Sequence, residues 1–151
     1  MPTAYLETTI PSYLAAYPSR DLVIAAHQQI THEWWRDAPT RFDLYIFEAV
    51  LDEIRTGDAD AAARRLAIVD QLPVLELNDD VWSLVAAYDQ RLGLVGRARA
   101  DLPHFAFAVA YEMDYLVTWN CAHIANGEII RRLRDAPLIV TPEEVLEPPG
   151  D

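Results

Sequence analysis

The sequence contains no lysine, only one cysteine and five glycines, and no long apolar run. Because Cys121 has no partner for an internal disulfide, the chain is typical of a reducing compartment. No apolar segment approaches the ~20 residues that a helix needs to cross a bilayer. The first residues, MPTAYLETT, lack the basic start and apolar stretch of a secretory signal. We therefore expect a cytoplasmic protein with no membrane segment.

Positive charge is also scarce. Twelve arginines face 24 acidic residues, which gives a net charge of −12. Such a surface repels nucleic acid at long range, because affinity for a phosphate backbone comes largely from cationic side chains that displace counterions. An enzyme acting on nucleic acid would therefore need a cation in its site and a local arginine patch. Two candidate patches are Arg97 with Arg99, and Arg131 with Arg132 and Arg134.

The composition is that of a globular protein. Hydrophobic residues make up 52% of the 151 residues and charged residues 24%, and a chain of this length is most simply one domain. We expect that domain to span residues 1–146, followed by a disordered tail over 147–151.

Short apolar segments alternate with helical patterns along the chain. Strands are expected over 3–7, 42–47, 73–77, 114–120 and 136–141. Helices are expected over 11–16, 21–37, 48–57, 58–72, 78–94, 101–113 and 122–135. This alternation predicts an α/β fold, in which helices cover both faces of a parallel sheet of about five strands.

Polar residues stand where two of these strands end. Glu7 ends the first strand and Asn120 ends the fourth, and ligands of such sheets bind beyond the carboxyl ends of the strands. Asp101 and His104, one turn apart, open an otherwise apolar helix and could serve the same crevice. Glu53 lies closer to the apolar stripe of its helix than its neighbouring acid does, so we expect it to point inward.

The candidate site is therefore Glu7, Glu53, Asp101 and Asn120, all of which offer oxygen. Three carboxylates brought together repel one another unless a cation neutralises them. Oxygen ligands suit Mg²⁺ or Mn²⁺, which can polarise a phosphate and activate a water. One cysteine and four scattered histidines show no spacing typical of a zinc site.

Each of these residues also has a purely structural explanation. Glu7 can lie at a helix N-terminus, where negative charge is favoured, and Asp101 can cap its helix. Glu53 can be a solvated surface residue, Asn120 a turn residue, and His104 a buried, hydrogen-bonded histidine.

Three stretches together resemble the PIN-domain family, and specifically the VapC-type toxins of bacterial toxin–antitoxin systems. They are YLETTIPSYLAAYPSRD, VLDEIRTGD and RADLPHFAFAVAYEMDYLVTWNCAHIAN. The resemblance covers nearly the whole chain and implies a three-layer αβα fold with a central parallel sheet. It also implies that Mg²⁺ or Mn²⁺ is bound through clustered acids.

The resemblance can be carried over residue by residue. Glu7 matches the family's first acid, which is usually Asp, and Glu53 matches its helix glutamate. Asp101 matches the third acid, and Asn120 a fourth position that is often Asp. Thr118 matches a hydroxyl residue near the metal shell.

The function that this resemblance implies is a metal-dependent endoribonuclease, the toxin of a toxin–antitoxin pair. It would hydrolyse RNA phosphodiester bonds with a metal-activated water and leave a 5′-phosphate. The expected partners are RNA, an antitoxin whose basic segment occupies the site, and a second copy of the chain in a homodimer. The alternative is a non-catalytic PIN-like module that binds RNA or a protein partner, because Glu7 and Asn120 depart from the family pattern.

Two other classes with doubly wound sheets fit less well. Phospho-receiver domains resemble one another in needing a lysine near the phosphate, and this chain has none. A dinucleotide-binding fold would need a G-x-G-x-x-G motif after the first strand, which is also absent.

Overall fold

The computed structural model describes residues 1–120 and 138–146 of the chain. The helix expected over 122–135, Cys121, the arginines at 131, 132 and 134, and the tail over 147–151 lie outside the described residues. Within the described part, no helix is both long enough and apolar enough to span a bilayer.

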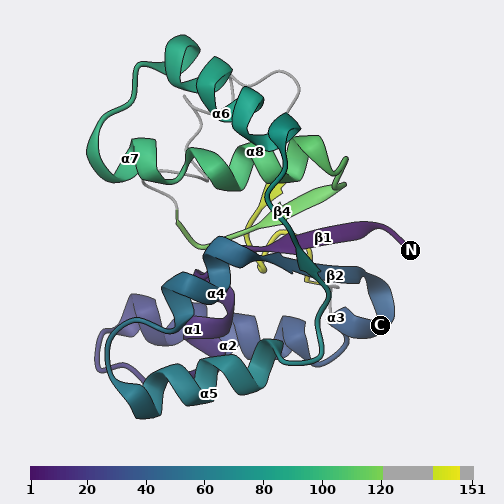
Figure 1. The fold of residues 1–151 in the computed structure, drawn as a ribbon. Coiled ribbons are helices and arrows are strands. Elements are labelled where there is room, and N and C mark those ends of the chain that lie inside the picture. The colour runs from purple at the N-terminus through teal and green to yellow at the C-terminus, as the bar shows by residue number, and fades with distance from the viewer. Residues whose placement is uncertain (121–137, 147–151) are drawn as a thin grey trace.

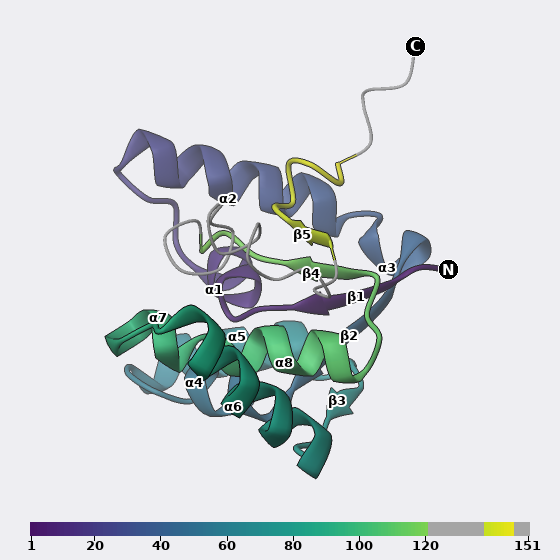
Figure 2. The same ribbon diagram turned by 90° about the horizontal axis from the view of Figure 1, so that it is seen from above.

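A five-stranded sheet, parallel throughout, forms the centre of the molecule, as the sequence predicts. Its strands are β1 (Thr3–Leu6), β2 (Asp43–Phe47), β3 (Val74–Leu75), β4 (Tyr115–Val117) and β5 (Leu138–Val140). They lie in the order β3-β2-β1-β4-β5, which Figure 2 shows from above.

Helices cover both faces of this sheet (Figure 1). On one face lie α6 (Asp79–Leu92), α7 (Gly96–Ala100) and α8 (Leu102–Ala110). On the other lie α1 (Thr9–Ala15), α2 (Leu22–Trp35), α3 (Ala38–Arg41), α4 (Glu48–Ile54) and α5 (Ala59–Val69). The arrangement is a three-layer αβα fold.

The central strand β1 determines where a ligand can bind. It pairs with β2 on one side and β4 on the other, so that Tyr5 lies opposite both Tyr45 and Leu116. The chain leaves β1 toward β2 and returns to its other side as β4. This reversal opens a crevice beyond the carboxyl ends of β1 and β4. Glu7 follows β1 directly, and Thr118 follows β4 directly.

The core explains why the sequence of α8 is apolar all round. The helix lies between α6 and the sheet (Figure 1), and residues 104–108 of α8 are all buried. Phe107 stacks on Phe47 of β2 with ring centroids 3.5 Å apart. A helix that packs against neighbours on two sides buries most of its circumference, so apolar residues are needed nearly everywhere on it.

The helix ends follow the local sequence. Asp21 accepts hydrogen bonds from the backbone of Val23 and Ile24 at the start of α2, and Asn78 accepts one from Val81 at the start of α6. Gly93 ends α6 in the left-handed conformation, with a φ of 59°, which glycine adopts without steric cost.

Two strands are shorter than the sequence predicts. Beyond Val117, the Thr118 backbone still donates to the Val140 carbonyl, but the next two backbone donors turn to side chains: Trp119 donates to the Thr9 hydroxyl and Asn120 to the Thr118 hydroxyl. β3 ends at Leu75, which pairs with the last residue of β2. The short helices α3 and α7 were not expected, since neither is long enough to show a helical period.

A matched pair of leucines tests this core. Leu116 in β4 is fully buried, whereas Leu22 at the start of α2 is 86% exposed. We expect Leu116→Ala to lower the free energy of unfolding by about 3 kcal/mol, because it leaves a cavity in the core. We expect Leu22→Ala to change it by less than about 0.5 kcal/mol. Urea unfolding followed by circular dichroism measures both values, and equal losses would contradict this packing.

Candidate metal site

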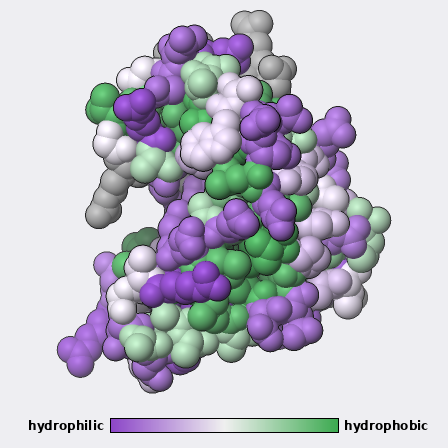
Figure 3. Space-filling view, viewed as in Figure 1, coloured by the Kyte–Doolittle hydropathy of each residue, from purple (hydrophilic) through white to green (hydrophobic). Residues whose placement is uncertain are grey.

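A recess marks the place where the carboxyl ends of the strands meet the surface. Figure 3 shows it at the left of the molecule, between the layer that contains α7 and α8 and the layer that contains α4. These elements carry Asp101, His104 and Glu53, and the ends of β1 and β4 bring Glu7 and Asn120. The crevice expected from the order of the strands therefore coincides with a hollow in the surface.

Glu7 is a buried carboxylate with one oxygen fully engaged. Its side chain is only 4% exposed. Its Oε1 accepts hydrogen bonds from the Thr9 hydroxyl at 2.6 Å, from the Thr9 backbone at 3.1 Å and from the Thr118 hydroxyl at 2.7 Å. The bond from the Thr9 backbone is the interaction expected of an acid at a helix N-terminus. The bonds from the two hydroxyls go beyond that structural role. The other oxygen, Oε2, has no hydrogen bond among the described residues.

Glu53 reaches the site from α4. The apolar stripe of α4 buries Val50 and Ile54, as expected, and Glu53 lies at the edge of that stripe. Its Oε2 accepts a short hydrogen bond from the Thr8 hydroxyl. Its Oε1 lies 3.3 Å from Nε2 of His104. The carboxylate of Glu53 is therefore fixed by contacts with Thr8 and His104 and does not move freely in solvent.

His104 is the residue whose role the sequence left most open. It is 1% exposed, and its Nδ1 lies 2.7 Å from the hydroxyl of the fully buried Tyr5. With Glu53 on its other nitrogen, both ring nitrogens have partners. Its place one turn after Asp101 was the only signal in the sequence, and that spacing does not reveal Tyr5 as the residue that orients the ring.

Glu7, Glu53 and His104 form a compact group of possible metal ligands. One ligand atom from each lies within 4.8 Å of those of the other two. The three side chains come from the end of β1, from α4 and from α8, so the fold and not a local motif brings them together. The expected pairing of Glu7 with Glu53 is present, and His104 joins it.

Asp101 and Asn120 meet in a second contact. Asn120 Nδ2 donates to Asp101 Oδ2 at 3.1 Å. Asp101 occupies the cap position of α8, yet its side chain makes no capping hydrogen bond. Helix capping therefore does not explain this acid. Its sharing of a cation with Glu7 and Glu53 stays a prediction.

Burial and neighbouring groups shift the pKa values of Asp101 and Glu53 in opposite directions. Burial raises the pKa of Asp101 above its usual value, and the charges of Glu7 and Glu53 raise it further. Burial also acts to raise the pKa of Glu53, but the hydrogen bonds from His104 and Thr8 and the charge of His104 bring it below its ordinary value.

The residues present fit a divalent cation. Two or three carboxylates with an amide and an imidazole nearby give a mostly oxygen donor set, which suits Mg²⁺ or Mn²⁺. The buried Glu7 carboxylate has one oxygen, Oε2, that accepts no hydrogen bond among the described residues, which leaves it open to a cation.

The described part of the chain contains only one of the expected arginine patches. Arg99 donates to Asp89 at 2.9 Å, so its charge is paired. The side chain of Arg97 and the patch at 131, 132 and 134 lie outside the described residues, so the expectation of a local arginine patch stays a prediction.

No protein-family model and no curated protein matches the sequence. Among solved structures, a chain in the crystal structure of VapBC2 from Rickettsia felis, bound to a DNA fragment from their promoter, is similar over 92% of this chain and 98% of that chain. The TM-score is 0.64 and the sequence identity 16%. A likeness at this identity establishes the fold, and the expected PIN-like three-layer αβα architecture is confirmed.

The pKa of His104 makes the stability of the metal-free protein depend on pH. Burial lowers this pKa, but the hydrogen bond to Glu53 and the charges of Glu7, Glu53 and Asp101 outweigh burial and raise it above 6.5. The protonated ring therefore stabilises the fold fully below pH 6.5, and this contribution is lost as the pH rises through the higher folded-state value.

Unfolding of His104→Gln and of the unmodified chain in EDTA measures the effect. We expect the unmodified chain to be the more stable by a margin that shrinks between pH 6 and pH 9. A margin that stays constant or grows over that range would contradict the charge arrangement described here.

Proposed function

We propose that the protein is a metal-dependent endoribonuclease and that it acts as the toxin of a toxin–antitoxin pair. The observation that carries this proposal is the convergence of Glu7, Glu53 and His104, from three separate elements, within 4.8 Å. It lies at the carboxyl ends of the central strands of a fold similar to that of VapBC2. Phosphodiester hydrolysis is the chemistry that such a cluster of carboxylates supports best.

The acidic side chains and Asn120 would bind the cation, and the threonines would position the acids. Glu7, Glu53 and Asp101 would hold the cation, with Asn120 as a neutral fourth ligand or as the group that orients Asp101. When bound, a divalent cation supplies charge neutralisation and Lewis-acid polarisation of the phosphodiester. Thr9 and Thr118 fix the Glu7 carboxylate through Oε1 and leave Oε2 available.

Thr8 and His104 hold Glu53 in the same way. The Thr8 hydroxyl bonds one carboxylate oxygen and His104 lies against the other. Such supporting contacts keep acids in place that would otherwise repel one another. The buried Tyr5 completes the arrangement, because its hydroxyl lies against His104 Nδ1 and fixes the orientation of the ring.

A protein partner belongs to the proposal. VapBC2 was crystallised as a complex with promoter DNA, and we propose that this chain likewise pairs with an antitoxin. The net charge of −12 suits a partner with a basic segment that enters the acidic site. Assembly of two copies of the chain stays a prediction.

The alternative is a non-catalytic module that binds RNA or a protein partner. Asn120 motivates it, because an amide in place of a carboxylate removes one negative charge from the site. Metal binding and RNA cleavage, measured on the same protein, separate the two functions.

Two glutamates of α4 provide a matched test. Glu53 contacts His104, whereas Glu48 lies exposed in the first turn of the same helix. We expect Glu53→Gln to weaken Mn²⁺ binding at least tenfold and to abolish Mn²⁺-stimulated RNA cleavage, because it removes a charged ligand. We expect Glu48→Gln to change neither. Calorimetry and a gel assay with labelled RNA measure both properties, and undiminished cleavage by Glu53→Gln would contradict the proposal.

Asp101→Ala tests the toxin function in cells. Expression of the unmodified chain without its antitoxin is expected to arrest growth, and Asp101→Ala is expected to relieve the arrest while the protein stays folded. Colony counts after induction measure this outcome, with circular dichroism of the purified variant as the folding control. A variant that is as toxic as the unmodified chain would show that Asp101 does not serve the toxic activity.

A further inference from the structure

A second cavity lies between α1 and α5, outside the group of acids that forms the candidate metal site. It has a volume of about 150 Å³ and is lined by three alanines, Ser12, Tyr17, Arg64 and Arg65. A water molecule takes up roughly 30 Å³ in the liquid, so the cavity has room for a group the size of a phosphate. Two arginines in one small cavity are notable in a chain with a net charge of −12.

Arg65 brings a positive charge that the described residues do not neutralise. Its Nη2 donates to the backbone carbonyls of Ile54 and Thr56, each at 2.8 Å. These acceptors are neutral, and no carboxylate of the described residues makes an ion pair with Arg65. The guanidinium is thus positioned by hydrogen bonds while its charge remains available.

Arg64 is positioned beside it. Its guanidinium lies 4.1 Å from the centre of the Tyr17 ring, and its Nη1 pairs with Asp60 at 2.9 Å. Asp60 is largely exposed, with 74% of its side chain accessible, so solvent weakens this ion pair. The Nε atoms of both Arg64 and Arg65 are buried and have no hydrogen-bond partner among the described residues.

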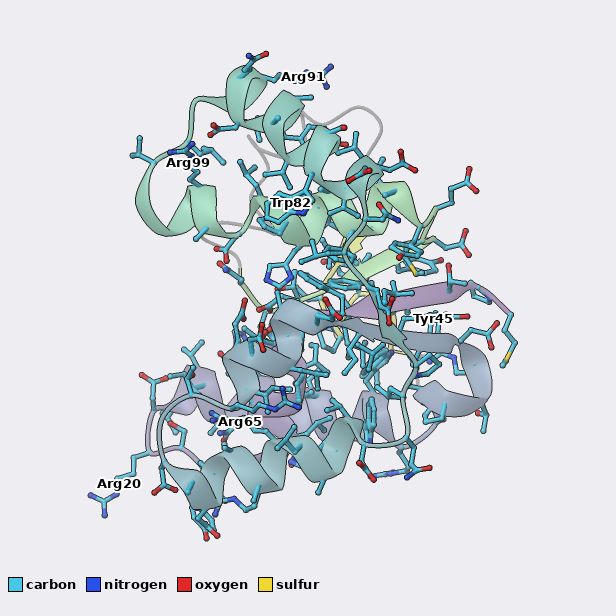
Figure 4. All side chains as sticks on the ribbon, viewed as in Figure 1. Arg20, Tyr45, Arg65, Trp82, Arg91 and Arg99 are labelled. Atoms are coloured by element: carbon cyan, nitrogen blue, oxygen red, sulfur yellow. The ribbon has the colours of Figure 1, made fainter. Side chains whose placement is uncertain are left out.

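The cavity lies next to the candidate metal site along two elements. The backbone of Ser12 bonds Thr8, one turn earlier in α1, and the Thr8 hydroxyl bonds Glu53. Of the carbonyls that Arg65 binds, Ile54 is the last residue of α4 and directly follows Glu53, and Thr56 lies two residues beyond the helix. Figure 4 shows Arg65 between α5 and α4 on the same side as the recess. One helical turn is about 5.4 Å, so a single strand of RNA can reach both places.

We propose that this cavity binds a backbone phosphate of the RNA, one or a few nucleotides from the bond that is cut. The proposal rests on the ribonuclease function proposed above. Guanidinium groups match the geometry of phosphate oxygens, and the Ser12 hydroxyl, which makes no hydrogen bond among the described residues, is a further donor. The site would supply the local positive charge that an acidic protein needs to hold a phosphate backbone.

Arg64→Gln tests the site, and Arg99→Gln is its matched control. Both arginines form a 2.9 Å ion pair with an aspartate, but Arg99 lies in α7 on the opposite layer. Asp60→Asn acts in the opposite direction, because it releases Arg64 from its exposed partner. The probe is a short fluorescein-labelled single-stranded RNA, and anisotropy in EDTA over a series of salt concentrations measures its binding without metal or cleavage.

We expect Arg64→Gln to weaken binding roughly tenfold and to reduce the slope of log affinity against log salt by about 0.7, the value for one phosphate contact on a single strand. We expect Asp60→Asn to tighten binding several-fold and Arg99→Gln to leave it within about twofold. Equal losses in Arg64→Gln and Arg99→Gln, or no change in Asp60→Asn, would overturn the phosphate site. So would tighter, Arg64-dependent binding of an acidic peptide of equal charge, which would assign the cavity to carboxylates.

Cleavage of the same RNA with Mn²⁺ separates this inference from the proposed function. If RNA binding depends on Arg64 but no RNA is cleaved, the phosphate site is supported and the ribonuclease function is rejected. If the RNA is cleaved but its binding does not change in Arg64→Gln, the ribonuclease function is supported and the phosphate site is rejected.

Discussion

The structure depends on keeping one carboxylate buried and charged. Glu7 stands at the end of the central strand with almost no exposure to solvent, where an unpaired charge would be costly. Hydrogen bonds from Thr9 and Thr118 make it tolerable, and these residues belong to the start of α1 and the end of β4. The requirement to satisfy Glu7 therefore ties together three elements that are far apart in the sequence. The crevice between β1 and β4 keeps its shape because of these bonds.

Elsewhere in the site, threonine hydroxyls also fix acidic side chains by hydrogen bonds. Thr8 holds Glu53, and the Thr9 hydroxyl that bonds Glu7 also accepts the backbone of Trp119. Negative charge gathered in this way attracts a cation, and the arginine pair at the neighbouring cavity adds positive charge. The proposed phosphate-bearing substrate rests on both features.

The sequence predicted the fold well because its signals were local. The alternation of strands and helices depends on near neighbours in the chain, and so does the start of a helix near Asp21. The position of Glu53 at the edge of the apolar stripe followed from the pattern of its helix, although its side chain is 45% exposed. The contacts of His104 with Tyr5 and Glu53 could not be predicted from the sequence. His104 and Tyr5 are 99 residues apart, and the spacing of apolar residues carries no information about so distant a contact. The cavity of Arg64 and Arg65 was missed for the same reason, since it forms only when α1 packs on α5.

The central claim is that side chains from β1, α4 and α8 share one divalent cation. A crystal of the protein grown with Mn²⁺, with anomalous diffraction data collected at the manganese edge, tests it most directly. The account predicts an anomalous peak in direct contact with the carboxylates of Glu7 and Glu53, with Asp101 or His104 completing the protein ligands. A fully occupied manganese elsewhere on the surface, with Glu7 and Glu53 still bonded only to Thr8, Thr9, Thr118 and His104, would contradict it.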